Sequence, residues 1–295
     1  MVIGALEAGG TKMVMAIGDE QGNVIDTCSI PTETPELTMP RMIQYFTSHK
    51  IEALGIGCFG PIDLDKDSNT YGFITSTPKL AWRNYNLVGA FENSLHIPVG
   101  FDTDVNAAAL GEATWGSTKG LSDSIYITIG TGIGVGVIQN YSLLHGMLHP
   151  EAGHLLLSKR EDDAYVGKCP YHKKCMEGLA SGPAIQERWG KPAKELKKEN
   201  KVWDLEAYYI AQGLVNFILT LSPKRIVLGG GVMQQEQLFP LIRVKVKELL
   251  AGYIQTKELE DLDNYIVPAS LNGKQGIMGC FMLALDAIKE HSLDN

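Results

Sequence analysis

A short segment near the middle of the chain carries four side chains of the kinds that bind metal ions. They are His154, Cys169, His172 and Cys175, with the spacing H-x14-C-x2-H-x2-C. Two thiolates and two imidazoles are suited to tetrahedral zinc, and a complete four-ligand shell leaves no open position for water. The spacing therefore predicts a structural zinc site. The alternative is two free cysteines beside surface histidines.

Two glycine-rich turns between strands could bind an anion. Their residues are Gly9, Gly10, Thr11 and Lys12 in the first turn, and Gly130, Thr131 and Gly132 in the second. Glycine lets backbone N–H groups approach an anion with no Cβ in the way, and the threonine hydroxyls add donors. The repetition of the turn predicts a polyphosphate site, although each turn taken singly could be an ordinary hairpin turn. Neither matches a Walker loop, and the strand after the second turn argues against a dinucleotide-binding unit.

Asp104 stands where an expected strand ends and an expected helix begins. The helix dipole and nearby backbone amides keep a carboxylate ionised at such a position. An ionised carboxylate could accept the proton of a sugar hydroxyl that attacks the γ-phosphoryl group of a nucleotide, as kinase aspartates do. The alternative role is helix capping, which Asp102 and Thr103 could share.

Two acidic residues flank the predicted zinc ligands. Glu151 precedes His154 by three residues, and Glu177 follows Cys175 by two. If zinc fixes this segment, both carboxylates are held on a rigid frame, which is what gripping sugar hydroxyls requires. Each could instead be a solvated surface acid.

Alternating strands and helices must position these residues. The expected strands cover residues 1–6, 13–17, 24–30, 51–59, 98–101, 124–129, 133–138 and 225–228, and the expected helices cover 35–48, 105–114, 205–221, 238–250 and 276–290. The first three strands form an antiparallel meander, and the strands within 124–138 repeat its opening hairpin. The pattern predicts an α/β fold with mixed sheets.

Length and composition set broader limits. A chain of 295 residues with 44% hydrophobic residues suits two domains with packed interiors. The formal charge of -8 and the lack of a basic block argue against a nucleic-acid partner. Because no run is apolar enough to span a membrane, we expect a soluble cytoplasmic protein. The five cysteines indicate reduced thiols, with Cys28, Cys58 and Cys280 in the core.

Five motifs taken together resemble those of the ROK sugar kinases. They are Glu7-Ala-Gly-Gly-Thr-Lys12, Thr103-Asp104-Val-Asn-Ala-Ala-Ala-Leu-Gly-Glu112, Gly130-Thr-Gly-Ile-Gly134, Glu151-Ala-Gly-His154 and Cys175-Met-Glu-Gly-Leu-Ala-Ser-Gly-Pro183. The likeness runs from end to end and is strongest to the zinc-containing fructokinases of the Bacillus type. It implies an actin-like, ribonuclease-H-like fold of two lobes with the active site between them. We expect lobes at 1–115 and 116–275, and a C-terminal helix at 276–295 that packs back on the first lobe.

The resemblance also assigns roles to residues of this chain. It makes Asp104 the general base. The residues implied at ATP and Mg²⁺ are Glu7, Gly9, Gly10, Thr11, Lys12, Gly130, Thr131, Gly132, Gly230 and Gly231. The residues implied at the sugar are Gly60, Pro61, Thr103, Asp104, Glu151, His154 and Glu177, so His154 would contact both zinc and sugar.

Three residues depart from the commoner family pattern. Most members carry Asp at the position of Glu7, which leaves open how Glu7 contacts Mg²⁺. Glucose-type relatives carry Asn at the position of Thr103, which argues against a glucokinase. His172 replaces a cysteine of the commoner zinc loop, so its role as a ligand follows from spacing.

The resemblance, together with these residues, implies a homodimeric fructokinase that uses ATP, Mg²⁺ and structural zinc to phosphorylate the 6-hydroxyl of D-fructose. A broader hexokinase acting on mannose, glucose or an N-acetylhexosamine is the first alternative. A non-catalytic sugar sensor is the second, because the family includes repressors with an N-terminal helix-turn-helix domain. The phosphate-binding strand begins within seven residues of Met1, which leaves no room for such a domain in this sequence. A degraded kinase that binds sugar without turnover is a further alternative.

Overall fold

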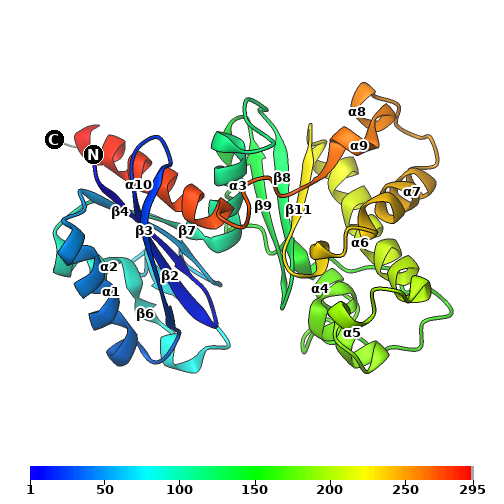
Figure 1. Ribbon diagram of the computed structural model, residues 1–295, viewed down its shortest axis with the longest axis horizontal. Helices are drawn as coiled ribbons and strands as arrows, with labels where there is room; N and C mark the ends of the chain where they lie inside the picture. The colour runs from blue at the N-terminus through cyan, green and yellow to red at the C-terminus, as the bar shows by residue number, and fades with distance from the viewer. Residues whose placement is uncertain (294–295) are drawn as a thin grey trace. The chain divides into compact units, whose positions relative to one another are not determined.

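A computed structural model describes residues 1–293 of the chain and divides into two compact units. Figure 1 shows the helices and strands of both. Unit 1 comprises Met1–Lys119, Leu143–His149 and residues 270–293, and unit 2 comprises Gly120–Ser142 and Pro150–Ala269. The α/β class with mixed sheets is confirmed. The domain boundaries expected from the sequence stay a prediction. The units differ from them at residues 116–119, 143–149 and 270–275, all of which group with unit 1.

Within the described residues, unit 1 contains a five-stranded sheet with the order β3-β2-β1-β4-β7. Its strands are β1 (Ile3–Ala8), β2 (Lys12–Gly18), β3 (Val24–Pro31), β4 (Ala53–Cys58) and β7 (Val99–Thr103). The first three pair antiparallel and so confirm the expected meander, whereas β4 and β7 extend the sheet in parallel. A small ribbon of β5 (Phe73–Ile74) and β6 (Tyr85–Asn86) was not expected.

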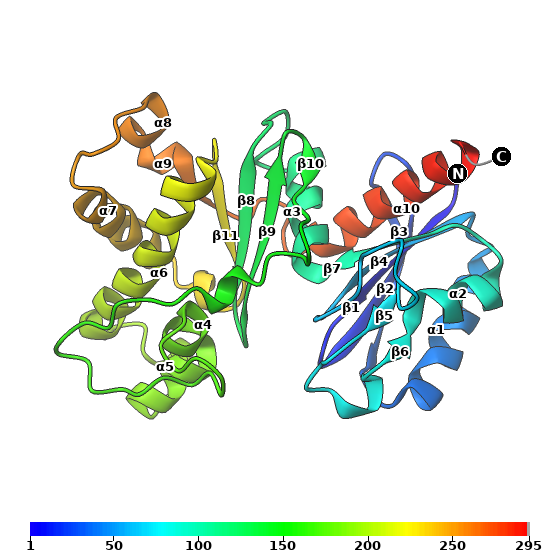
Figure 2. The same ribbon diagram turned by 180° about the vertical axis from the view of Figure 1, so that it is seen from behind.

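Helices cover both faces of this sheet (Figure 2). One core contains side chains of α1 (Pro35–His49) and α2 (Leu87–Leu95), together with Leu6 of β1. The other contains side chains of α3 (Asp104–Trp115) and α10 (Gln275–Leu293), together with Ala5 of β1. Neighbouring residues of β1 thus point into opposite layers, as the pleat of a strand requires. The backbone of α10 lies so close to β4 that a Cβ on Gly55 would be 1.7 Å from the carbonyl oxygen of Cys280.

Unit 2 repeats the strand arrangement of unit 1. Its five-stranded sheet has the order β10-β9-β8-β11-β12 in the described chain. The strands are β8 (Ser124–Ile129), β9 (Ile133–Gln139), β10 (Ser142–Leu143), β11 (Ile226–Gly229) and β12 (Ile266–Pro268). The pair β8 and β9 is antiparallel, and β11 joins β8 in parallel, as β4 joins β1. The expected repeat of the opening hairpin is therefore confirmed.

The helices of unit 2 vary widely in length. They are α4 (Met176–Ala180), α5 (Gly182–Trp189), α6 (Asn200–Leu221), α7 (Leu238–Leu250), α8 (Lys257–Glu260) and α9 (Leu262–Tyr265). Single 3-10 turns occur in both units at η1 (Leu80–Trp82), η2 (Ala152–His154), η3 (Ala193–Glu195) and η4 (Val232–Gln234). Over residues 1–293, no helix is both long enough and apolar enough to cross a membrane.

Candidate functional site

The four potential metal ligands come together in unit 2. One ligand atom from each of His154, Cys169, His172 and Cys175 lies within 4.8 Å of all the others. The distances from Sγ of Cys169 to Nδ1 of His154 and of His172 are 3.7 and 3.8 Å, and Sγ of Cys175 is 3.5 Å from Nδ1 of His154. Zinc bonds of about 2.0 to 2.3 Å give a tetrahedron with edges of about 3.3 to 3.8 Å. These three separations therefore fit a zinc ion, and the remaining ones lie within 4.8 Å.

Local backbone structure presents the two thiols to this centre. Cys175 is the N-cap of α4, and its Sγ accepts a hydrogen bond from the Gly178 N–H at 3.3 Å. Sγ of Cys169 accepts from the His172 N–H at 3.5 Å. Burial raises the pKa of the Cys175 thiol to about 11. Two thiols and two imidazoles are the donor types that structural zinc takes, so the chemistry of this donor set also fits a bound metal.

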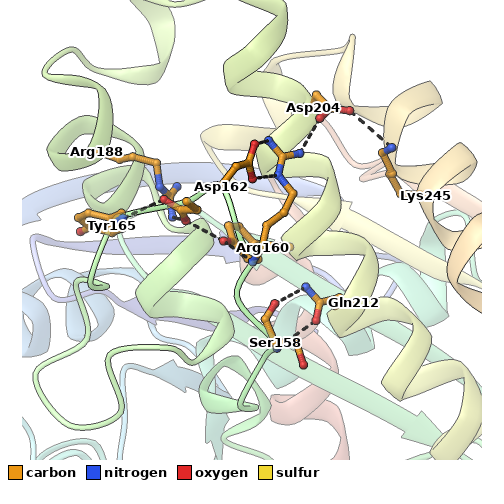
Figure 3. A network of polar contacts seen from close by, with 10 residues as sticks. Ser158, Arg160, Asp162, Tyr165, Arg188, Asp204, Gln212 and Lys245 are labelled. Atoms are coloured by element: carbon orange, nitrogen blue, oxygen red, sulfur yellow. Dashed lines mark hydrogen bonds and ion pairs between the residues drawn. The ribbon is translucent and has the colours of Figure 1, made fainter.

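The segment between the first two ligands is anchored on α6 by polar contacts (Figure 3). Arg160 donates to Asp204 of α6 at 2.7 Å and to its neighbour Asp162 at 2.6 Å. The Ser158 backbone and the Gln212 side chain exchange two hydrogen bonds of 3.0 and 2.9 Å. These contacts fix the interior of the segment, while its two ends carry the metal ligands His154 and Cys169.

A buried set of charged and phenolic groups lies under the same segment. Asp163 accepts a hydrogen bond from the Tyr209 hydroxyl at 2.7 Å and pairs with Arg188 at 3.3 Å. Both partners of this ion pair are nearly inaccessible to solvent. Glu206 is also buried, and burial raises its pKa well above the ordinary value, with Arg188 opposing the shift.

The second glycine turn lies against α4 and the start of α5. The Gly130 N–H donates to the Gly132 carbonyl at 2.9 Å, which closes the turn, and the Gly130 carbonyl accepts from the Gly182 N–H at 2.8 Å. Oε2 of Glu177 accepts from the Ile133 N–H at 3.0 Å. A Cβ on Gly132 would lie 2.7 Å from the same oxygen. The Glu177 carboxylate therefore packs against the turn, and a side chain at position 132 would displace it.

The glycines after β11 lie beside this turn within unit 2. A Cβ on Gly130 would be 3.8 Å from the backbone nitrogen of Gly231. Gly230 has a φ of +89°, and a Cβ on it would lie 2.4 Å from the carbonyl oxygen of Ile129. The structure thus brings together the two glycine segments of unit 2 that the sequence assigned to ATP.

The first glycine turn belongs to unit 1 and follows β1. The Gly9 N–H donates to the Lys12 carbonyl at 3.0 Å, and Thr11 and Lys12 are exposed. Burial raises the pKa of Glu7, at the end of β1, and the nearby Lys12 ammonium opposes this shift. A Cβ on Gly276 would lie 2.6 Å from Oε2 of Glu7, so the first turn of α10 packs directly on this carboxylate.

Asp104 is the first residue of α3 and is half-buried. Its Oδ1 accepts from the Val105 N–H at 2.8 Å. Thr103 is the N-cap, because its hydroxyl oxygen accepts from the Asn106 N–H at 3.1 Å. A Cβ on Gly57 would lie 3.3 Å from Cα of Asp104, and Gly57 pairs with Glu7 across β4 and β1. Glu7 therefore lies near the carboxyl end of β1 and Asp104 just after the carboxyl end of β7, with β4 between these two strands. The carboxyl ends of parallel strands are where open α/β sheets bind ligands.

The residues predicted at the sugar divide between the two units. Thr103, Asp104 and the cis-linked pair Gly60 and Pro61 belong to unit 1, and the Pro61 carbonyl accepts from the Thr75 N–H at 2.9 Å. The others belong to unit 2, and they are Glu151, His154 and Glu177. Glu151 is exposed, and its carbonyl accepts from the His154 N–H at 3.0 Å.

Two contacts of the candidate site left no signal in the sequence. One is the bond from the Ile133 N–H to Glu177, between residues 44 positions apart. The other joins His145 to Asp102 across 43 positions. No motif contains His145, and a backbone N–H carries no side-chain signal. The expectation of three core cysteines was wrong for Cys28, which is half-buried, whereas Cys58 and Cys280 are buried.

Comparisons with known proteins give a consistent result. A family model described as ROK family matches residues 3–287. A protein of Bacillus subtilis (strain 168) is 52% identical over 98% of this chain and 97% of its own. A fructokinase of Pediococcus pentosaceus is 46% identical over 98% of this chain and 99% of its own. The crystal structure of a ROK family glucokinase from Streptomyces griseus in complex with glucose and AMPPNP has a TM-score of 0.76 and 26% identity, and covers 97% of this chain and 100% of that one.

Proposed function

The chain belongs to the ROK family, and from this premise we propose that it is an ATP-dependent fructokinase, which transfers the γ-phosphoryl group of ATP to the 6-hydroxyl of D-fructose. Its fold is the actin-like fold of ROK sugar kinases. The observation that carries the chemistry is the position of Asp104, a half-buried carboxylate in the first turn of α3. The choice of fructose is supported by the fructokinase name of a 46% identical relative.

Asp104 acts as the general base in this proposal. The N-terminus of α3 and the bond from the Val105 N–H to Oδ1 stabilise its charge, and the ionised carboxylate accepts the proton of the 6-hydroxyl. The glycine turns of each unit donate backbone N–H groups to the phosphates, which stabilises the charge that develops on the transferring phosphoryl group.

A carboxylate ligand for Mg²⁺ is available at Glu7. Carboxylate oxygens suit this cation, and the position of Glu7 beside the Gly9 to Lys12 turn places it with the phosphate-binding residues of unit 1. When bound, Mg²⁺ would supply charge neutralisation on the phosphate oxygens. Glu7 is held in place by the first turn of α10, which packs against its carboxylate.

We assign one structural zinc ion to His154, Cys169, His172 and Cys175. A four-ligand shell leaves the metal no catalytic position, so its contribution is to hold the segment that carries the sugar residues. Glu177 lies two residues after Cys175 on α4. Its Oε2 accepts a hydrogen bond from the Ile133 N–H, so we assign its Oε1 to the sugar. Glu151, Gly60, Pro61 and Thr103 complete the proposed sugar contacts, and the proposed assembly is a cytoplasmic homodimer.

Asp104→Asn tests the proposed base. Asn keeps an Oδ1 that can accept from Val105 N, so the fold should remain intact while turnover falls by about 100- to 10,000-fold, the range of general-base contributions. Asp286→Asn, which removes the same charge from a partly exposed pair with Lys289, is the matched control and should leave turnover unchanged. Turnover above a few per cent of wild type in Asp104→Asn would refute the assignment.

A panel of sugars decides the substrate. Initial rates with ATP should give the highest kcat/KM for fructose, with mannose, glucose and the N-acetylhexosamines lower. A preference for one of these would favour the broader hexokinase. A fully folded protein that phosphorylates no sugar would favour the non-catalytic sugar sensor over either kinase.

A further inference from the structure

A second aspartate lies buried immediately before the proposed base. Asp102, at the end of β7, is 3% exposed. Its Oδ1 accepts from the Thr103 N–H and from the Asn106 side-chain amide, both at 2.7 Å. The two bonds span the first turn of α3, with Asp104 between them. Asp102 therefore fixes the backbone on which the base stands.

The other oxygen of Asp102 bonds to a histidine from a distant part of the chain. Nε2 of His145 lies 2.8 Å from Oδ2 of Asp102. A carboxylate oxygen can only accept, so Nε2 carries a proton whether the imidazole is neutral or charged. The hydrogen bond with Asp102 raises the pKa of His145, while partial burial opposes the shift.

The segment that contains His145 belongs to unit 1, although the chain on both sides of it belongs to unit 2. The chain leaves unit 2 at Ser142, joins unit 1 as Leu143–His149, and returns to unit 2 at Pro150. His145 is the residue of that excursion whose side chain makes a charge-assisted bond to a strand of the unit 1 sheet. A buried carboxylate costs free energy unless it is compensated, and His145 supplies the compensation on one side.

We propose that His145 is a positioning residue that acts through Asp102 on Asp104. The imidazole holds Oδ2 of Asp102, which leaves Oδ1 directed at Thr103 N and Asn106, and these bonds set the first turn of α3. Without His145 the Asp102 side chain is free to rotate toward solvent, and the direction of the Asp104 carboxylate is no longer fixed. The proposal rests on the role of Asp104 as the base, given above.

Steady-state kinetics of His145→Leu and His145→Gln test this role. We expect His145→Leu to lower kcat by about 30-fold, because small displacements of a catalytic group have effects of this order, while KM for ATP changes by less than about twofold. Gln retains an N–H that can donate to Asp102 and should restore kcat to within about fivefold of wild type. His49→Leu, which breaks an exposed pair with Asp26 in the same unit, is the matched control and should leave kcat unchanged.

Two further measurements separate positioning from general stability. In an Asp102→Ala background, which removes both carboxylate oxygens, His145→Leu should have an effect at least about fivefold smaller than in wild type, because the partner through which it acts is gone. A wild-type kcat for folded His145→Leu, or an undiminished effect in that background, would overturn the proposal. If His145→Leu does not fold, His145→Asn replaces it, since its shorter side chain cannot reach Asp102, and a kcat equal to that of His145→Gln would likewise overturn it.

The same series distinguishes failure of this inference from failure of the proposed function. If Asp104→Asn is inactive and His145→Leu has wild-type kcat, only the positioning role fails. If Asp104→Asn is active, both the base assignment and the positioning role fail.

Discussion

Removal of the Glu177 carboxylate should weaken ATP binding through the glycine turn. Glu177→Ala deletes the bond from the Ile133 N–H, which is 3.0 Å long. A hydrogen bond to a charged group contributes about 1.5 to 3 kcal/mol, which corresponds to about 10- to 150-fold in an equilibrium constant. Because Glu177 is half-buried and Gly182 holds Gly130 independently, we expect the lower end of this range. KM for ATP should therefore rise about 10-fold.

The assay measures KM for ATP at saturating fructose, and KM for fructose at saturating ATP. Glu187→Ala is the matched control, because it removes an exposed glutamate of α5 that pairs with Lys168, and it should change neither constant. A second route to the same perturbation is Gly132→Ala, whose Cβ would lie 2.7 Å from Oε2 of Glu177. The two changes should be non-additive, since both act on one contact.

A KM for ATP within about twofold of wild type in folded Glu177→Ala would contradict the expected 10-fold rise from the lost hydrogen bond. A rise in KM for fructose without one for ATP would show that the carboxylate serves the sugar and that the turn holds its shape without it. A rise in both KM values would agree with one Glu177 oxygen bonded to the Ile133 N–H and the other at the sugar.

Two other predictions concern the metal centre and the buried glutamate. Metal analysis should find about one zinc per chain. Chelation should lower Tm and raise KM for fructose, because Cys175 caps the helix that carries Glu177. Fully active protein without metal would exclude this assignment. Burial raises the pKa of Glu206, so above about pH 4.5 the folded state keeps a proton that the unfolded state has lost. The free energy of unfolding therefore falls by up to about 1.4 kcal/mol per pH unit as the pH rises toward the folded-state pKa. Glu206→Gln should remove this slope in urea unfolding between pH 5 and pH 8, and identical slopes in both proteins would contradict the assignment.

Helices were predictable where their signal was long. The expected helix at 35–48 corresponds to α1 (Pro35–His49), and that at 276–290 to α10 (Gln275–Leu293). The nine-residue α2 was not predicted, because Gly89 lies in its interior and it has too few turns for a clear apolar period. The short helices α4 and α5 lie in a stretch with Gly178, Gly182 and Pro183, residue types that usually interrupt helices.

The sequence by itself determined which chemical groups are present and how closely they follow one another. Neighbouring residues constrain each other through local geometry, so the spacing of the metal ligands, the glycine turns and the strand-to-helix step at Asp104 could be recognised from the order of residues. The family followed from the same motifs, and the comparisons confirm it.

Tertiary structure alone decided which distant groups complete each site. The bond of Glu177 to Ile133 N and the bond of His145 to Asp102 join residues more than 40 positions apart. Such contacts depend on the path of the chain within each unit, including the return of Leu143–His149 to unit 1, and that path is set by tertiary packing rather than by any local pattern.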